Sequence, residues 1–374
     1  MRIKIQQFLF GKNHSWSVVS KSLGRSFIKF GHDVEFVSTD GFKEEYCPND
    51  LRPFIKSEPT GIYDLQLSYT APHNWPIYLR NGNKNRFAIW NYEYKNKRGA
   101  KKTLLEGFSK FSNDVDIVLP SSNFSKEVFE DMKVPADKMV VVPHGVNADD
   151  FKTDKITELK TNKKIKILLN IAQPHRRKNL PAALNSFGKA FTKNDDVCLV
   201  AKVFIKNKGI KGKDSVFDVD FLAMLKTFES KFKNHAEVEL VTQYISNIAE
   251  IYNVCQINFS ATHAECFWLP GLEAMAAGMV NICPKYGGLL DFCNYENSLL
   301  VKGLENRAGR EHQYWHYNPY AVHFEIDTND AAYKLQKAVY NYNELIEQFK
   351  PNMEATVKQF SWDNAAKQIL DLSK

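Results

Sequence analysis

The amino-acid sequence predicts an α/β protein of two domains, and three observations carry this prediction. The chain has 374 residues, which is the length of roughly two ordinary domains. Short apolar runs of the kind that form buried parallel strands alternate along it with amphipathic helical patterns. Hydrophobic residues make up 44% of the sequence and aromatic residues 13%, so the chain can fill two cores.

The first half of the chain opens with a strand–helix–strand pattern. Apolar residues at 2–10 and 34–38 predict two strands, and the amphipathic segment 18–30 between them predicts a helix. Further apolar runs predict strands at 64–69, 87–90, 117–119 and 139–142.

Two details of the first half concern a helix start and a turn. A helix is expected at 121–132, capped by Ser121 or Ser122, whose hydroxyl can accept a backbone N–H. Gly145 follows the run 139–142, and we expect it in a turn that needs a positive φ, which glycine tolerates.

The second half repeats the alternation after a charged segment at 149–164, which is expected to be a linker. The apolar run 165–171 predicts the strand that opens a second domain, and a helix follows it to residue 191. The segment 360–363 is expected to lead into the last helix of the chain, which ends at residue 372. The remaining expected elements are strands at 197–204, 238–241, 254–259 and 280–283 and a helix at 247–254.

The stretch 261–280, ATHAECFWLPGLEAMAAGMV, lies between a strand pattern and the start of a helix. Ligands of open α/β sheets bind outside the carboxyl ends of strands, which is where Glu265 lies. Two carboxylates beside an anion site fit a nucleotide sugar, with Glu265 facing the sugar and Glu273 the ribose. A solvated loop carboxylate and a partner for the helix dipole are the alternative. The expected anion site consists of the backbone N–H groups of Trp268, Leu269 and Gly271.

A longer match carries a family resemblance. The residues from Glu265 to Gly278, E-C-F-W-L-P-G-L-E-A-M-A-A-G, resemble the donor loop of the retaining nucleotide-sugar glycosyltransferases of family 4. The usual loop of that family is E-G-F-G-L-P-x-L-E-A-M-A-x-G. Cys266 and Trp268 therefore stand in place of two glycines, which implies a sugar pocket of different shape.

The resemblance implies a fold and a reaction. The fold is GT-B, with two Rossmann-like domains that face each other across a cleft. The expected domains are an acceptor-side domain at 1–152, with a final helix at about 360–374 packed back on it, and a donor-binding domain at 153–359. The reaction is transfer of a hexose-type sugar from a nucleoside diphosphate, with retention, to a glycan, lipid-linked or protein acceptor.

The resemblance also implies site residues. Glu265 and Lys178 are the expected catalytic residues, and Lys178 matches a family lysine that holds the diphosphate. The family arginine has no direct counterpart, so Arg176 or Arg177 is expected to supply its charge, and the choice stays open. The expected donor-binding residues are Glu273, Arg176, Arg177, Phe267, Trp268, Leu269, Gly271 and Leu272. The expected acceptor-side or sugar-side residues are Gly11, His14 and Glu93, with surface positions as the alternative for His14 and Glu93.

No metal and no organic cofactor is expected. Two Asp-x-Asp sequences, at 114–116 and 218–220, have the spacing of a metal motif, but three-residue matches recur by chance. We also expect neither Glu265 nor Glu273 to belong to a core, so loss of either side chain should leave the melting temperature unchanged.

Composition limits the partners and the compartment. The formal net charge of +7 suits anionic substrates or peripheral contact with a membrane surface, and it is too diffuse to indicate nucleic acid. The N-terminus is too short and polar for a signal peptide, and no apolar run reaches about 20 residues. Six cysteines without a C-x-x-C pair predict free thiols in a reducing cytoplasm, so we expect a cytoplasmic protein, free or at the inner membrane face.

Two other functions are consistent with the pattern. One is a nucleotide-sugar epimerase or hydrolase on the same fold, which would convert or release the sugar without an acceptor. The other is a non-enzymatic basic binding protein, which would bind with a steep salt dependence and would be insensitive to the loss of Glu265.

Overall fold

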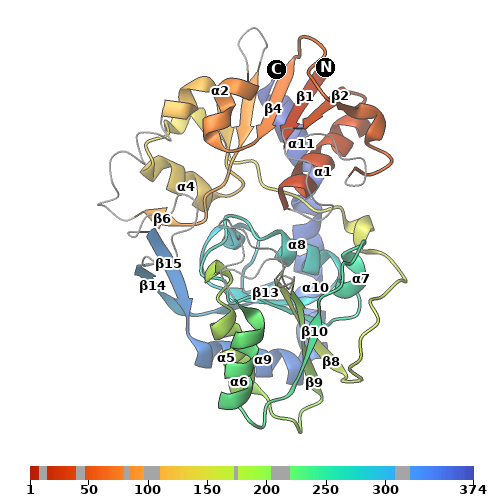
Figure 1. Ribbon diagram of the computed structural model, residues 1–374, viewed down its shortest axis with the longest axis vertical. Coiled ribbons are helices and arrows are strands. Elements are labelled where there is room, and N and C mark those ends of the chain that lie inside the picture. Colours follow the sequence, from red (N-terminus) through yellow and green to blue (C-terminus); the bar gives the residue numbers. More distant parts are fainter. Residues whose placement is uncertain are drawn as a thin grey trace. The chain divides into compact units, whose positions relative to one another are not determined.

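The computed structural model describes residues 1–7, 15–38, 47–79, 85–96, 110–171, 176–203, 220–307 and 321–374. The chain forms two compact units (Figure 1). The first unit comprises Met1–Val146 and Gln359–Lys374, and the second comprises Asn147–Lys358. The C-terminal segment therefore belongs to the first unit.

A six-stranded parallel sheet forms the centre of the first unit. Its strands are β1 (Arg2–Gln7), β2 (Asp33–Ser38), β3 (Ile55–Lys56), β4 (Leu65–Tyr69), β5 (Arg86–Ile89) and β7 (Ile117–Leu119), and β6 (Lys95–Asn96) lies outside this sheet. Their order across the sheet is β3-β2-β1-β4-β5-β7. Ile5 and Leu67, paired on the two central strands, are at most 1% exposed, as expected for a parallel sheet covered on both faces.

The helices of the first unit cover this sheet. They are α1 (Ser15–Lys29), α2 (Trp75–Tyr78), α4 (Asn123–Asp131) and α11 (Trp362–Leu372), with 3-10 turns η2 (Arg52–Phe54), η3 (Pro72–Asn74), η4 (Ser112–Asp114) and η5 (Ala136–Lys138). The first and last helices of the chain pack together, and Asp363 accepts hydrogen bonds from Ser26 Oγ at 2.8 Å and Lys29 Nζ at 2.6 Å. Of the two serines expected as the cap of α4, Ser122 holds the position and accepts the N–H of Ser125.

Two expectations for the first unit are wrong. The run 139–142 is not a strand. It runs parallel to β7 and is joined to it by an isolated bridge and by two hydrogen bonds, from Val140 N–H to Val118 O and from Val142 N–H to Pro120 O. Pro120 has no N–H with which to return a bond, so the ladder cannot continue. Gly145 does not have a positive φ. It is needed because a Cβ there would lie 2.3 Å from the backbone nitrogen of Trp362.

A second six-stranded parallel sheet forms the centre of the second unit. Its strands are β8 (Ile165–Ile171), β9 (Val197–Val203), β10 (Glu237–Val241), β11 (Ile257–Phe259), β12 (Val280–Pro284) and β13 (Ser298–Val301). Their order is β10-β9-β8-β11-β12-β13, which repeats the pattern of the first sheet. An antiparallel hairpin of β14 (Gly303–Arg307) and β15 (Ala321–Ile326) follows in the chain.

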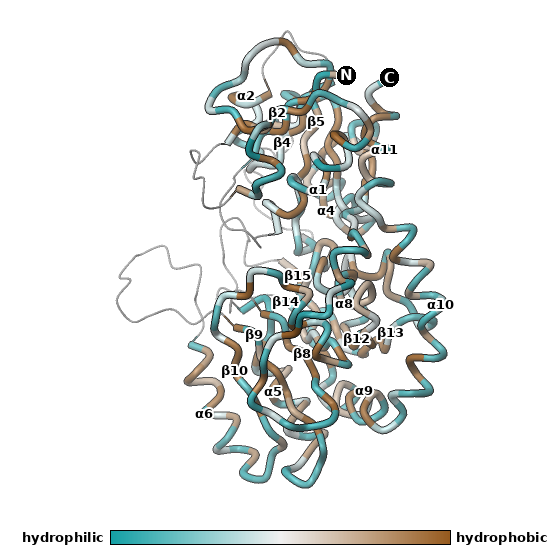
Figure 2. Tube along the Cα trace, turned by 90° about the vertical axis from the view of Figure 1, so that its right-hand side faces the viewer, coloured by the Kyte–Doolittle hydropathy of each residue, from teal (hydrophilic) through white to brown (hydrophobic). Residues whose placement is uncertain are grey.

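The helices of the second unit are α5 (Leu180–Ala190), α6 (Phe221–Lys231), α7 (Ala249–Tyr252), α8 (Leu269–Ala276), α9 (Thr328–Tyr340) and α10 (Tyr342–Gln359), with 3-10 turns η6 (Ala148–Phe151), η7 (Arg176–Lys178) and η8 (Gly288–Asp291). The long helix α10 is largely hydrophilic, whereas β12 and β13 are hydrophobic (Figure 2). Gly278 follows the C-cap of α8 with a φ of +78°, the left-handed conformation in which many helices end.

The predicted fold class is confirmed: each unit is a Rossmann-like α/β domain around a parallel sheet, the pair of domains that makes up the GT-B fold. The cysteines are free thiols, and all except the partly exposed Cys266 are buried. Among the described residues, no helix combines the length and apolar character that a membrane crossing requires.

Candidate active site

The candidate site lies where the strand order of the second sheet reverses. β8 and β11 are neighbours in the sheet, although they are far apart in sequence. The chain leaves β8 towards η7 and leaves β11 towards the loop that contains Glu265. Ligands of doubly wound sheets bind outside the carboxyl ends of strands at such a switch point. The topology therefore brings together two segments about 90 residues apart.

Glu265 is the centre of a buried cluster of charges. Its Oε1 lies 2.7 Å from Nζ of Lys178, and its Oε2 lies 2.8 Å from a guanidinium nitrogen of Arg177. The side chains are 8% exposed for Glu265, 13% for Arg177 and 20% for Lys178, so these ion pairs are only weakly screened by water. Two cations against one carboxylate leave the cluster with one positive charge in excess.

Backbone contacts hold the loop of Glu265 in place. The N–H of His263 donates to the carbonyl of Arg177 at 2.8 Å, and Arg177 donates to the carbonyl of Ala264 at 2.7 Å. On the other side, Gly288 N–H donates to the carbonyl of Glu265 at 2.8 Å. Gly287 has a φ of +90°, and a Cβ there would lie 2.8 Å from the same carbonyl oxygen. Glycine is therefore required at position 287 by its positive φ and by its close backbone approach to the loop.

The charge cluster fixes the ionisation of Glu265. Burial alone would raise the pKa of this carboxyl, but Arg177 and Lys178 outweigh it and lower the pKa from 4.5 to about 2. Glu265 is therefore a carboxylate over the whole physiological range. Glu265 was expected to lie outside a core, but it is buried and paired. Its removal would leave two partly desolvated cations, so we now expect a lower melting temperature for this variant.

The geometry distinguishes the two adjacent arginines. Arg177 joins the buried cluster, whereas Arg176, which begins η7, is exposed. Lys178 ends the same turn and lies in the cluster beside Arg177. The sequence left open which arginine supplies the second positive charge, and only Arg177 lies against Glu265.

Glu273 lies in a different environment on α8. Its Oε2 accepts a hydrogen bond of 2.8 Å from the hydroxyl of Tyr252, which in turn accepts one of 2.9 Å from the amide of Asn170. Burial raises the pKa of Glu273 from 4.5 to about 7, and the bond from Tyr252 only partly opposes that increase. Tyr252 is fully buried, so the two hydrogen bonds from Asn170 to Tyr252 and from Tyr252 to Glu273 fix the carboxyl of Glu273 from the interior of the protein.

The first turn of α8 is tightly packed. Trp268 precedes it with a φ of +81°, a conformation that glycine adopts readily and tryptophan rarely. Its ring lies over Gly271, where a Cβ would come within 2.0 Å of it. The N–H of Gly271 already donates to the carbonyl of Trp268 at 3.0 Å, so it is not available to an anion in this conformation. Phe267, Leu269 and Leu272 are buried, so donor contacts there would be made by the backbone.

Of the residues expected on the acceptor side, only Glu93 belongs to the part of the chain that the structure describes. Gly11 and His14 lie outside the described residues, and Glu93 is partly buried in the segment after β5. The sequence did not point to an aromatic group at the carboxyl edge of the first sheet. Trp16 packs against Tyr69 at 5.6 Å and against Trp90 at 5.2 Å between ring centroids. The sequence signal that could have revealed this group is one aromatic residue at each of three places: Tyr69 at the end of β4, Trp90 after β5 and Trp16 at the start of α1.

Asp116 and Asp220, which belong to the two Asp-x-Asp sequences, have other partners. Asp116 forms an ion pair of 2.7 Å with Arg86 and also accepts the backbone N–H of that residue. Asp220 caps α6 by accepting the N–H of Ala223, and 218–219 lie outside the described residues.

The comparisons with known proteins agree with this architecture. No family model matches the chain, and no curated protein matches it. Its fold resembles that of a glycosyltransferase from Rickettsia africae ESF-5, with a TM-score of 0.71 and 15% identity over 100% of this chain and 97% of that one. It also resembles Anabaena HepE solved with UDP-glucose, with a TM-score of 0.71 and 11% identity over 100% and 99% of the two chains. Sucrose-phosphate synthase from Thermosynechococcus elongatus gives 0.71 and 15% over 99% and 98%.

Proposed function

We propose that this protein is a retaining glycosyltransferase that moves a hexose-type sugar from a nucleoside diphosphate to a glycan, lipid-linked or protein acceptor. One observation carries the proposal: the buried cluster of Glu265, Lys178 and Arg177 at the switch point of the second sheet. The full-length likeness in fold to a glycosyltransferase and to HepE bound to UDP-glucose supports the same class of donor.

The cluster suits the charges of such a transfer. As the sugar leaves, negative charge grows on the diphosphate and positive charge grows on the anomeric carbon. Lys178 and Arg177 are placed to neutralise the first, and Glu265 to stabilise the second. In the free protein Lys178 and Arg177 are paired with Glu265, so an arriving diphosphate would share the cations with Glu265. The excess positive charge of the cluster favours that exchange.

Glu273 is assigned to the ribose. Its carboxyl is held by Tyr252 on one oxygen, and it can accept hydroxyl donors from a nucleotide whether it is ionised or protonated. The two cations and the start of α8 supply the positive charge that a metal supplies elsewhere, so the proposed chemical step needs no metal. Turnover should therefore be unchanged by chelators and by added Mg²⁺ or Mn²⁺.

The test is a screen of nucleoside diphosphate sugars for release of the nucleoside diphosphate, with and without a panel of acceptors. Transfer with the anomeric configuration kept, measured by NMR of the product, is the expected result. The variant Glu265→Gln should lose it, whereas Glu229→Gln, which changes an exposed glutamate on α6, should not. Sugar release or conversion without any acceptor would indicate the hydrolase or epimerase instead, and absence of nucleotide-sugar binding would refute the proposal.

A further inference from the structure

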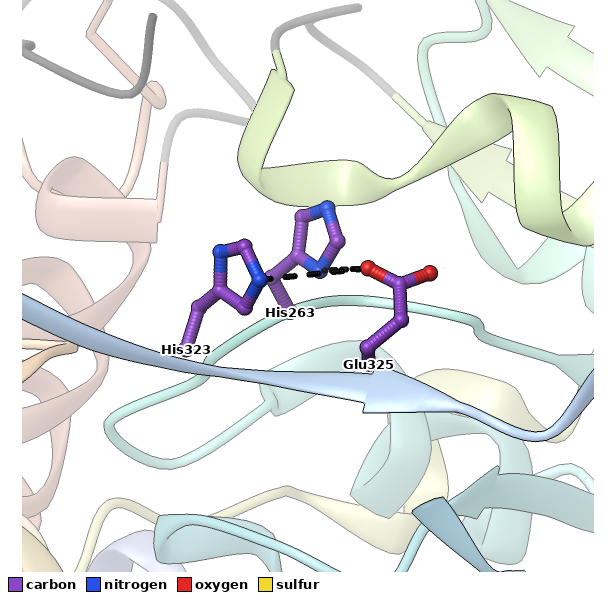
Figure 3. A group of neighbouring side chains, drawn as sticks. All are labelled: His263, His323 and Glu325. Carbon is purple, nitrogen blue, oxygen red and sulfur yellow. Dashed lines mark ion pairs between the residues drawn. The ribbon is translucent and has the colours of Figure 1, made fainter. Parts of the chain in front are cut away.

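Two histidines and a glutamate gather beside the candidate site (Figure 3). His323 and Glu325 are two residues apart on β15, so their side chains lie on one face of the strand. His263 comes from the loop after β11, two residues before Glu265. The N–H of Phe324 donates to the carbonyl of His263 at 2.9 Å, which joins the strand to the loop at this point.

The spacing of the three side chains is that of metal ligands. Oε2 of Glu325 lies 3.4 Å from Nδ1 of His263 and 3.9 Å from Nε2 of His323. The ligand atoms of the three residues all lie within 4.8 Å of one another. Tetrahedral bonds of about 2.0–2.1 Å place neighbouring ligand atoms about 3.3 Å apart, so a small movement would complete the geometry. Two imidazoles and one carboxylate are also a common ligand set of open zinc sites.

Burial and orientation favour a bound ion over a solvated cluster. His263 and His323 are 5% and 8% exposed, whereas the side chain of Glu325 is 42% exposed. The site is therefore closed on the histidine side and open on the carboxylate side, where a water could complete the coordination. The other oxygen of Glu325 accepts the amide of Asn179 at 3.3 Å, which orients the carboxylate as outer partners of metal ligands do.

Binding requires a local rearrangement of the rings. The two imidazoles are stacked, with centroids 4.3 Å apart and planes 13° apart, so their lone pairs do not yet converge. Rotation about the Cβ–Cγ bond of a histidine is soft and can turn a ring out of the stack. Nδ1 of His263 also lies 3.1 Å from the carbonyl of Phe324, and an ion would displace any proton that this contact shares.

A second cluster among the described residues, Cys198 with Glu237 and Glu239, is a weaker candidate. Burial raises the pKa of the Cys198 thiol to about 12, so it is protonated and binds metal poorly. The carboxylate of Glu239 already accepts the backbone N–H groups of Lys160 and Thr161. This cluster supplies a matched control.

We propose that His263, His323 and Glu325 bind one divalent transition-metal ion of the Zn²⁺ type, with a fourth position open to solvent. The ion ties the hairpin β14–β15 to the loop that carries Glu265. The site is independent of the proposed transferase activity, because none of its ligands belongs to the cluster of Glu265, Lys178 and Arg177. It adds a further attachment to a loop that the two cations and Gly288 already position, so turnover does not depend on it.

The test uses the full chain stripped of metal by a chelator that is then removed. Titration calorimetry with Zn²⁺ should show one ion bound per chain, and Zn²⁺ should raise the melting temperature. Co²⁺ in its place should give the visible absorption of a tetrahedral site without a thiolate charge-transfer band. Both Glu325→Gln and His323→Gln should weaken binding by at least about 100-fold, since even outer partners of ligands are worth 10–100-fold.

Controls keep the result interpretable. Cys198→Ser should bind Zn²⁺ as the unmodified protein does. Glu325 is half-exposed, so Glu325→Gln should fold normally, and its metal-free melting temperature measures this directly. A thiolate band, binding that survives both ligand substitutions, or no stoichiometric binding at all would overturn the proposal. None of these outcomes bears on transferase activity, which the nucleotide-sugar screen measures separately.

Discussion

Glu265 and Glu273 are eight residues apart in one loop–helix segment, and the protein surrounds them with opposite chemistry. Glu265 is buried against two cations, and the pKa of its carboxyl falls to about 2. Glu273 is held by a neutral tyrosine hydroxyl, and burial raises the pKa of its carboxyl to about 7. The carboxylate of Glu265 is therefore compensated and permanently charged, whereas the carboxyl of Glu273 has no cation beside it and is partly protonated at neutral pH.

The difference separates two tasks. A permanent carboxylate beside cations that are attracted to a diphosphate can act on charge that develops only during a reaction. A carboxyl fixed by a buried hydrogen-bond chain is better suited to a contact that stays the same throughout. We therefore expect changes at Glu265 to affect turnover and changes at Glu273 to affect donor affinity. Each prediction below would break or sharpen that division.

The largest effect is expected for Glu265→Gln. Loss of the carboxylate should lower kcat on the order of 10³-fold, because it removes negative charge where positive charge develops. Free nucleoside diphosphate should bind at least as tightly as before, since Lys178 and Arg177 lose a competing partner. The melting temperature should fall by several degrees, because two partly buried cations lose their partner. Steady-state kinetics, calorimetry and thermal melts check the three parts, and loss of nucleotide binding with retained turnover would reverse the assignment.

The next effect is expected from the cations. Lys178→Ala should raise the barrier by about 2–4 kcal/mol through the leaving diphosphate. Arg177→Ala should have a comparable effect, and Arg176→Ala a much smaller one, because Arg176 is exposed and outside the cluster. Kinetics of the three variants with one donor decide the order. An Arg176 variant that is more impaired than the Arg177 variant would contradict the assignment of the two arginines.

The choice between these arginines marks a limit of the sequence. The match from Glu265 to Gly278 was enough to locate the loop and the helix, because turn and helix residues act locally. Whether Arg176 or Arg177 turns inward depends on the path of the chain after β8 and on a loop about 90 residues away. Local patterns do not contain that information.

Other features could not be predicted for the same physical reason. The partner of Glu273 is Tyr252, which lies 21 residues earlier on a short helix and has no local signal. The run 139–142 has the composition of a strand, but its pairing depends on Pro120 in a neighbouring segment. His323 and Glu325 lie on a hairpin strand that composition did not reveal, and only the fold brings them to His263.

Affinity for the donor should depend on Glu273, the glutamate on α8. Glu273→Ala should weaken nucleotide binding by about 10- to 100-fold, the value of hydrogen bonds to a charged group, while kcat at saturating donor changes little. Tyr252→Phe is the sharper test of the division, because it leaves the carboxyl in place and removes the bond that orients it. It should weaken binding less than Glu273→Ala does. Calorimetry with the free nucleoside diphosphate checks both, and a fall in kcat at constant affinity would contradict them.

The smallest effect is expected on the pH dependence of the free energy of unfolding, to which the two glutamates should contribute with opposite sign. The folded carboxyl of Glu273 keeps its proton up to about pH 7, whereas the unfolded one ionises near 4.5, so the folded state binds more protons between these values. Its contribution to the free energy of unfolding therefore falls as pH rises through that window. The folded carboxyl of Glu265 ionises near 2, so its contribution is complete above 4.5 and is lost as pH falls from there. Melting curves of Glu273→Gln should lose the first slope and keep the second. Retention of the slope between about 4.5 and 7 in that variant would show that another group titrates there, and the contrast between the two carboxyls would then rest on the Glu265 cluster alone.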